Sequence, residues 1–530
     1  MRYRTFLLVC FVSLIGVEAV RADATTDYNL AIELYSQQRW QLAVESCEEF
    51  VNKYPTHARV PDARLYWAQS LVHLRQFAPA REQYVLYLKT AKPDHPDRAL
   101  ATYRAGECSY FLGDLKQAQD WLSRFLQSYP ENNLEEWAIV YLGETDFRLN
   151  QFSEAKEAFE QSLNKYPNGR LVEDARYGLG RTLVRLGQTD QAIITFEEVA
   201  SKKESRRAPE AMFAIGSTYF DSGEFREAAK AFAQLLEDYP SSSLVSTAKL
   251  NAGYAHFSLK AYQTAITLFE EAAQDPEQAL TAIYWKGLSE KGLLDYAKAV
   301  TTFADSLEKA PTQPLAENLT YQWGDAEFRL ANYDKAVTLL KSVFEKWPQG
   351  EYADDALHLA TEAAFQRKDL PLARQLHQQF ITQYPKSPLV NVQNLLSGRI
   401  LVASGDQAKS EAEQRPFYLQ ALGVFEQVES RSNAPETRRQ ALFQLARTNE
   451  RLGNDADVVT QLGRLLSAEA ELSRSERYDA HLLRANASLR QGSAAEARQD
   501  YQRCQDLAES DEEQRQALTG LAGTQTSLLE

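Results

Sequence analysis

Side chains that could do chemistry are scattered through this sequence and do not form motifs. The chain has no G-x-x-x-x-G-K-[ST] run, no G-x-S-x-G, no H-E-x-x-H and no C-x-x-C pair. Acidic pairs such as Glu270–Glu271 are neighbours in sequence, and neighbouring helical residues point about 100° apart, which argues against an acid/base couple. We therefore expect no catalytic residue, no metal site, no cofactor and no enzymatic activity.

The histidines and cysteines do not change this expectation. His358 could contact a ligand, although an ordinary polar surface residue is the simpler interpretation, and His377 is expected in a core. Three cysteines follow residue 24, and an odd number excludes complete internal pairing. We expect Cys47, Cys108 and Cys504 to be small buried side chains.

The elements that position side chains in this chain are paired helices. In the stretch 211–240, Gly216 is followed twelve residues later by Ala228, and twelve later again by Pro240. Apolar residues recur at helical spacing on both sides of an interruption at Gly223. Because helices approach closely only where both carry a small side chain, and proline ends a helix, this pattern predicts an antiparallel helix hairpin. One such hairpin needs a neighbour on each side to bury its apolar face.

The same pattern recurs about thirteen times along the chain. A bulky plug follows the second small residue after four positions, as in Phe232, and a proline often ends the repeat. The first small residues are Ala31, Ala68, Gly106, Gly143, Gly180, Gly216, Gly253, Gly287, Gly324, Gly398, Ala446 and Ala485, with Thr361 as the one substitution. The second are Ala43, Ala80, Ala118, Ala155, Ala192, Ala228, Ala265, Ala299, Ala336, Ala373, Ala421 and Ala497, with Val458 as the exception.

These spacings resemble the tetratricopeptide repeat (TPR) family over residues 25 to about 505. Successive first small residues are mostly 37 apart, as from Gly106 to Gly143, whereas the family period is about 34. The extra residues lie in turns such as YPNGRLVEDA, which is similar to exported bacterial TPR proteins, in particular Tol–Pal-associated YbgF-like proteins and outer-membrane assembly lipoproteins. The resemblance implies an all-α fold, namely an α-solenoid of about thirteen helix-turn-helix hairpins with a C-terminal capping helix.

Residues 1–24 have the features of a secretory signal. Arg2 and Arg4 precede a short apolar run, and the small residues at 22–24 suit cleavage. Acylation of Cys10, as in a lipoprotein, is the alternative. We expect an exported, periplasmic protein with no transmembrane segment in the mature chain, and peripheral association with the outer membrane stays open.

Two further segments are expected after the signal. Residues 25–428 are predicted to form a TPR solenoid of about eleven repeats. An insertion at 405–416 is expected to lengthen one hairpin turn by eleven residues as a surface loop. Residues 429–530 are predicted to hold degenerate TPR repeats and, from Glu512 to Leu529, a single helix that caps the solenoid.

The resemblance also implies a concave groove, lined by residues three before and four after the first small residue. Aromatic rings occupy these positions repeatedly, and tyrosine and phenylalanine are favoured interface anchors. Packing against the neighbouring repeat is the alternative for each single ring. Six residues before the small residue there is no Lys or Arg, so capture of a partner's C-terminal carboxylate is not expected. The predicted partner-binding residues are Tyr103, Tyr110, Phe147, Tyr177, Phe213, Phe220, Phe257, Tyr284, Tyr321 and Phe328.

The net charge bears on the class of partner. A formal charge of −15 argues against nucleic acid, and the basic run at 201–207 is expected to face a helix end and solvent. We predict a non-catalytic scaffold or adaptor of the cell envelope that binds protein or peptide partners. The alternatives are an accessory or assembly factor for an outer-membrane, cell-wall or polysaccharide-export machine, and an accessory domain of a cell-wall enzyme.

Overall fold

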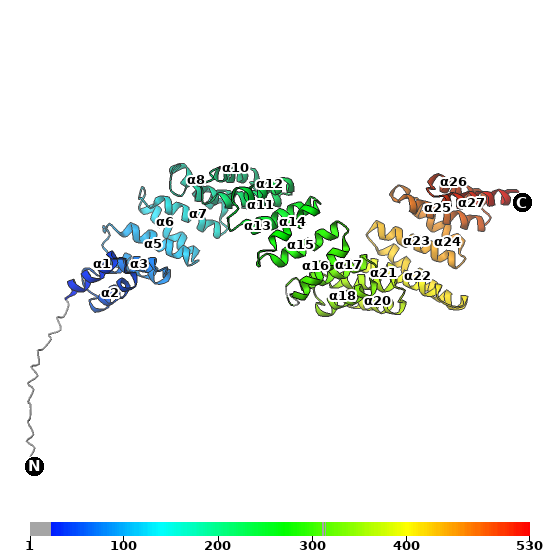
Figure 1. The fold of residues 1–530 in the computed structure, drawn as a ribbon, viewed down its shortest axis with the longest axis horizontal. Coiled ribbons are helices and arrows are strands. Elements are labelled where there is room, and N and C mark those ends of the chain that lie inside the picture. Colours follow the sequence, from blue (N-terminus) through cyan, green and yellow to red (C-terminus); the bar gives the residue numbers. More distant parts are fainter. Residues whose placement is uncertain (1–22, 310–311, 313, 530) are drawn as a thin grey trace, which may run out of the picture. The chain divides into compact units, whose positions relative to one another are not determined.

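The computed structural model describes residues 23–309, 312 and 314–529, and all its regular elements are helices. Within these residues there are 27 α-helices and one short 3₁₀-helix, and the described chain has no strand (Figure 1). The predicted signal peptide, with Cys10, lies almost wholly outside the described residues. Within unit 1 the helices α1 to α12 pair as successive hairpins, within unit 2 the helices α15 to α26 do the same, and α27 follows as a single helix, which confirms the predicted all-α hairpin architecture.

The chain divides into two compact units at Ala255/His256, inside helix α13, and each is described by itself. Unit 1 contains α1 (Ala24–Ser36), α2 (Trp40–Lys53), α3 (Val60–His73), α4 (Phe77–Thr90), α5 (Arg98–Phe111), α6 (Leu115–Ser128), α7 (Glu135–Arg148), α8 (Phe152–Lys165), α9 (Val172–Arg185), α10 (Thr189–Ala200), α11 (Ala208–Asp221), α12 (Phe225–Asp238) and most of α13 (Val245–Ser258).

Unit 2 begins in the last turn of α13. It contains α14 (Tyr262–Ala272), α15 (Ala279–Gly292), α16 (Tyr296–Lys309), α17 (Ala316–Arg329), α18 (Tyr333–Lys346), α19 (Ala353–Gln366), α20 (Leu370–Gln383), α21 (Val390–Asp406), α22 (Glu411–Arg431), α23 (Pro435–Arg451), α24 (Asp455–Leu466), η1 (Glu469–Glu471), α25 (Arg474–Arg490), α26 (Ala494–Leu507) and α27 (Asp511–Leu529).

The small residues allow the two helices of a hairpin to touch. A Cβ atom added at Gly216 would lie 2.7 Å from Cε1 of the plug residue Phe232, closer than carbon atoms can pack. Phe159 fills two such places, because Cβ atoms at Gly143 in its own hairpin and at Gly178 in the next would lie 2.9 and 2.4 Å from its ring. A single buried ring therefore locks one hairpin and the first helix of the next.

A left-handed residue closes the first helix in nearly every hairpin. The residue seven positions after the first small residue has a positive φ in twelve of the thirteen repeats predicted from the sequence: Gln38, Arg75, Gly113, Asn150, Gly187, Gly223, Lys260, Leu294, Ala331, Lys368, Gly453 and Gly492. This conformation lets backbone N–H groups beyond the helix bond to its last carbonyls, as Glu224 N donates to Tyr219 O at 2.9 Å. The turn geometry is thus common to the repeats even where the residue is not glycine.

The hairpin of α21 and α22 is the exception, and the predicted loop at 405–416 is wrong. Helix α21 runs 17 residues and α22 runs 21, so the insertion lengthens both helices, and Pro416 lies inside α22. Gly405 stays helical against the ring of Tyr418, whose hydroxyl donates to Asp406 Oδ1 at 2.8 Å. Arg451 of the next hairpin also pairs with Asp406, at 2.9 Å. These contacts hold the extended hairpin in place of a loop.

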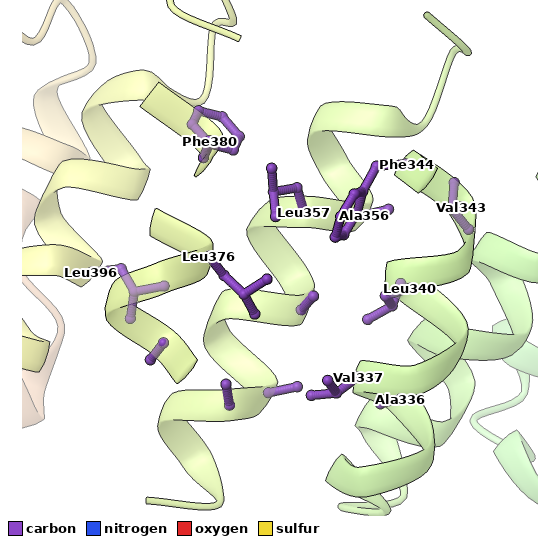
Figure 2. Packing of buried hydrophobic residues seen from close by; sticks show 14 of the residues in the cluster. Ala336, Val337, Leu340, Val343, Phe344, Ala356, Leu357, Leu376, Phe380 and Leu396 are labelled. Carbon is purple, nitrogen blue, oxygen red and sulfur yellow. The ribbon is translucent and has the colours of Figure 1, made fainter. Parts of the chain in front are cut away.

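Buried apolar side chains also join successive helices in unit 2. Figure 2 shows one apolar cluster in which Phe344 of α18 lies beside Ala356 and Leu357 of α19, with Val337 and Leu340 of α18 in the same cluster. Leu376 of α20 lies between α19 and α21 in the same cluster. All are buried, so the first helix α19 is covered on both sides by the second helices α18 and α20.

The predicted final single helix is confirmed as α27, and the degenerate repeats before it keep polar cores. Asp500 of α26 accepts hydrogen bonds from Arg484 Nε at 2.8 Å and pairs with His481 Nδ1 at 2.7 Å, both on α25. Gly520 of α27 lies against the ring of Tyr501. The buried charged cluster therefore lies in the same hairpin as an aromatic plug, because Tyr501, four residues after Ala497, is 2% exposed.

Replacing a contact glycine should test the hairpin rule. Gly216→Ala places a methyl group against the Phe232 ring, and we expect it to destabilise the α11–α12 hairpin by about 1–3 kcal/mol. Gly423→Ala is the matched control, because it lies within helix α22 and a Cβ there meets nothing within 4 Å. The control should be neutral or stabilising by up to about 1 kcal/mol. Hydrogen exchange of each hairpin measures both, and equal behaviour of the two variants would contradict the rule.

A buried carboxyl makes unit 1 sensitive to pH. Asp146 is 3% exposed, accepts from Gln119 Nε2 at 2.6 Å, and burial raises its pKa from 3.8 to about 6. Since the folded-state pKa is the higher one, ionisation destabilises the fold as pH rises through this range. Asp146→Asn should therefore stabilise unit 1 by about 1–3 kcal/mol near pH 8, and the gain should vanish below about pH 4. Urea unfolding across this range, with exposed Asp120→Asn as control, checks it; a gain independent of pH would contradict it.

Candidate functional site

Helix geometry determines which face of each first helix is open. The first small residue faces its own second helix, and residues three before and four after it are turned from it by only about 60° and 40°. Residues six and two before it, and one and five after it, are turned by about 100–160°. The predicted aromatic positions, three before and four after the small residue, therefore lie at the edge of the contact with the second helix. The positions six and two before it and one and five after it face away from that contact.

Two of the ten predicted partner-binding residues are buried in the hairpin, which corrects the prediction for them. Tyr103 is 2% exposed, its ring centroid lies 5.8 Å from that of Phe125, and its hydroxyl donates to Glu107 Oε1 at 3.1 Å. Tyr284 is 8% exposed and faces Phe303. Both rings face the second helix because they lie close to the small residue on the helix surface.

The other eight predicted residues are partly buried, and most contact a ring of their own hairpin or of the next one. Tyr177 and Phe213 pack on the plug rings Phe196 and Phe232, and Tyr321 stacks on Tyr352 at 4.5 Å. The rings after the small residue, including Tyr110, meet a neighbouring aromatic ring edge-on: Phe147–Phe152, Phe220–Phe225, Phe257–Tyr262, Phe328–Tyr333 and Tyr110–Tyr141. These rings form walls, with only part of each surface open.

Unit 1 contains a cavity of about 490 Å³ on the first-helix face, which we call the aromatic hollow. Of the ten predicted residues, only Tyr110 lines it. Phe111, which is 48% exposed, stacks on Phe77 at its rim. The hollow is lined by Tyr110, Phe111, Trp137, Val140, Tyr141, Glu144, Leu171, Asp174, Arg181, Arg206 and Arg207, from α5, α7, α9 and the segment before α11.

The charges in the aromatic hollow are paired with one another. Arg181 pairs with Glu144 at 3.5 Å, and Arg207 pairs with Asp174 at 2.7 Å. The Arg181 guanidinium also lies 4.2 Å from the ring centroid of Phe147. Burial raises the pKa of Tyr141 to about 12, so its phenol is neutral at physiological pH. The hollow therefore offers neutral rings and closed ion pairs, which suit an apolar or aromatic side chain of a partner.

Most hollow residues were missed by the sequence prediction. Phe111, Tyr141 and Arg181 lie five after, two before and one after a first small residue. The signal was available in the spacing, because these offsets share one helix face with Trp137, six before its small residue. The prediction chose the positions three before and four after the small residue instead, because aromatic residues recur there in more repeats.

Other singled-out side chains take structural roles. The basic run at 201–207 does not simply face solvent: Lys203 pairs with Asp238 at 2.6 Å and Arg206 with Asp174 at 3.3 Å, which links successive hairpins. His358 Nδ1 pairs with Gln393 Oε1 at 2.6 Å. Burial lowers the pKa of His377, which lies partly buried.

The three cysteines are free and buried, as predicted, and burial raises the pKa of each thiol to about 12. Over the described residues, no three His, Cys, Asp or Glu side chains are grouped so as to hold a metal ion. Within the same part of the chain, every helix is too short or too polar to cross a membrane.

Family comparison finds repeats in the region of the hollow. Tetratricopeptide repeat models match residues 100–132, 142–210 and 213–279, and the model of the outer membrane lipoprotein family YfiO matches residues 313–455. No curated protein matches the sequence.

The chain is also similar to solved helical structures. The C-terminal part of a TPR repeat-containing protein from Cytophaga hutchinsonii is 16% identical, with a TM-score of 0.41, covering 48% of this chain and 99% of that one. Yeast Tom70 is 16% identical with a TM-score of 0.36, covering 90% and 97%. The APC/C hetero-tetramer Cut9–Hcn1 is 13% identical with a TM-score of 0.35, covering 95% and 97%.

Tyr103 is buried within its hairpin and Phe111 is half exposed in the aromatic hollow. Removing these two rings should therefore lower the free energy of unfolding by different amounts. Tyr103→Ala should destabilise its hairpin by about 3–5 kcal/mol, because it empties a fully buried site. Phe111→Ala removes a ring that is already half exposed, and we expect a cost below about 1.5 kcal/mol. Thermal unfolding with hydrogen exchange over α5 and α6 compares them. A larger effect at Phe111 than at Tyr103 would mean that the two rings have been assigned the wrong roles.

Proposed function

We propose that this chain, in which tetratricopeptide repeat models match residues 100–132, 142–210 and 213–279, is a non-catalytic scaffold that binds a partner protein in the aromatic hollow of unit 1. The observation that carries the proposal is the hollow itself, a cavity of about 490 Å³ walled by Tyr110, Phe111, Trp137 and Tyr141. A cavity of this size takes one or two large side chains, and exposed aromatic rings are frequent anchors at protein interfaces.

The composition of the hollow favours a protein partner over a charged small molecule. Its cations are engaged by Glu144 and Asp174, so an incoming anion would have to displace an existing ion pair. An apolar side chain needs no such exchange and gains free energy by covering the rings. The partner segment that fits is therefore one with an exposed aromatic or large aliphatic residue.

We further propose that the protein acts in the cell envelope. The match of residues 313–455 to an outer membrane lipoprotein family supports this place, and so does the signal predicted at residues 1–24. A role as accessory or assembly factor for an outer-membrane, cell-wall or polysaccharide-export machine, and a Tol–Pal connection, belong to the same proposal.

Crosslinking in intact cells tests the partner and the site together. A photo-reactive amino acid at position 111 should capture a protein partner, identified by mass spectrometry, whereas the same group at exposed Glu157 on α8 should not. With the captured partner purified, Phe111→Ala and Trp137→Ala should each weaken binding by about 1–3 kcal/mol.

Glu157→Ala is the control and should leave affinity unchanged. Each variant must first keep the melting behaviour of the parent. If folded hollow variants bind as tightly as the parent while Glu157→Ala loses affinity, the partner docks on the second helices and the proposal is wrong.

A further inference from the structure

A second cavity of unit 1 has a different chemistry from the aromatic hollow. It has a volume of about 380 Å³ and lies between the second helices α4 and α6, over the first turn of α5. We call it the basic pocket. It is lined by Val85, Leu88, Lys89, Arg98, Thr102, Trp121, Arg124, Ser128 and Tyr129.

The basic pocket has three cations and no carboxylate in its lining. Lys89, Arg98 and Arg124 take part in none of the ion pairs within 4 Å that the described residues form. This cluster of unpaired cations lies in a chain with a formal charge of −15. Unpaired cations around one cavity favour an anionic group there.

The repeats provide an internal control for this pocket. Arg98 occupies the position that Glu135 takes 37 residues later, where Glu135 pairs with Lys165 at 2.6 Å. Arg124 occupies the position that Glu198 takes two repeats later, where Glu198 pairs with Arg176 at 2.8 Å. The fold accommodates an acid at both positions and closes an ion pair with it. At the α4–α6 junction arginines stand at both positions, and neither pairs with an acid within 4 Å.

Two of the three cations are held in place. Arg98 Nη1 donates to the carbonyl oxygens of Leu88 at 2.9 Å and Ala91 at 3.0 Å, at the end of α4. The guanidinium of Arg124 lies 4.7 Å from the ring centroid of Trp121. A guanidinium carries five N–H donors, so Arg98 keeps others for a ligand, and its fixed position lowers the entropic cost of binding. The pocket is therefore organised before any anion arrives.

We propose that the basic pocket binds an acidic segment of a partner protein, in which a carboxylate side chain is next to an apolar or aromatic one. The carboxylate would meet Lys89, Arg98 and Arg124, and its neighbour would cover Trp121, Leu88 and Val85. Charge complementarity selects the acid, and the apolar half of the lining selects the residue beside it. This site is separate from the aromatic hollow and does not depend on binding there.

Fluorescence anisotropy on the full purified chain tests the proposal. The probe is a labelled peptide of alternating Glu and Phe or Leu residues, and its match has Gln in place of every Glu. The acidic peptide should bind at least about tenfold more tightly than the Gln peptide, and its affinity should fall between about 50 mM and 300 mM salt as screening increases.

Charge reversal identifies the site. Arg124→Glu and Lys89→Glu should each weaken the acidic peptide about tenfold or more, whereas Lys116→Glu makes the same charge change at an exposed position of α6 and should have a much smaller effect. Phe111→Ala should leave the preference for the acidic peptide over the Gln peptide unchanged, because both peptides carry the same apolar residues, so failure of the aromatic hollow would be distinguishable.

Three results would overturn the proposal. They are equal binding of the acidic and Gln peptides, an effect of Lys116→Glu as large as that of Arg124→Glu, and no binding of the acidic peptide up to about 1 mM. Phosphatidylglycerol vesicles serve as the comparison probe. If vesicles bind through Arg124 and the peptide does not, the pocket recognises a lipid headgroup and the protein segment is excluded.

Discussion

Each hairpin depends on a contact between a small residue of its first helix and a bulky side chain of its second helix, with no space for another atom. Cβ atoms at Gly143 and Gly178 would both collide with the single ring of Phe159, so one side chain sets the distance within a hairpin and to the next. Where leucine replaces the ring, as Leu122 against Gly106, the approach is as close, at 2.9 Å. Where the first small residue is glycine, the hairpin therefore accepts a phenylalanine or a leucine plug but leaves no space for a larger first residue.

This contact also fixes the rotation of every first helix about its axis. Since the small residue must face the second helix, side chains near it on the helix surface become walls, as Tyr103 does against Phe125. Side chains on the opposite stripe are left open, as Phe111 is. The position of the aromatic hollow is thus a geometric consequence of hairpin packing. The chemistry of its lining depends on which residues occupy the open stripe in α5, α7 and α9.

The two cavities of unit 1 use charge in opposite ways. In the aromatic hollow, Arg181 and Arg207 are neutralised by Glu144 and Asp174, and the rings are the available surface. In the basic pocket, Arg98 and Arg124 form no ion pair, whereas Glu135 and Glu198 at the equivalent positions of two other repeats are paired, and the positive charge is available.

The sequence by itself determined the hairpin number, the order of the helices and the unpaired last helix, because small-residue spacing and helix periodicity are local properties of the chain. It did not determine the path through 405–416, where contacts of Tyr418 and Arg451 with Asp406 favour longer helices over a loop. Nor did it separate Tyr103 from Phe111, since both are aromatic and only eight residues apart. Only the tertiary structure decided which ring is open, because exposure depends on the second helix and on the next repeat, which a single helix does not encode.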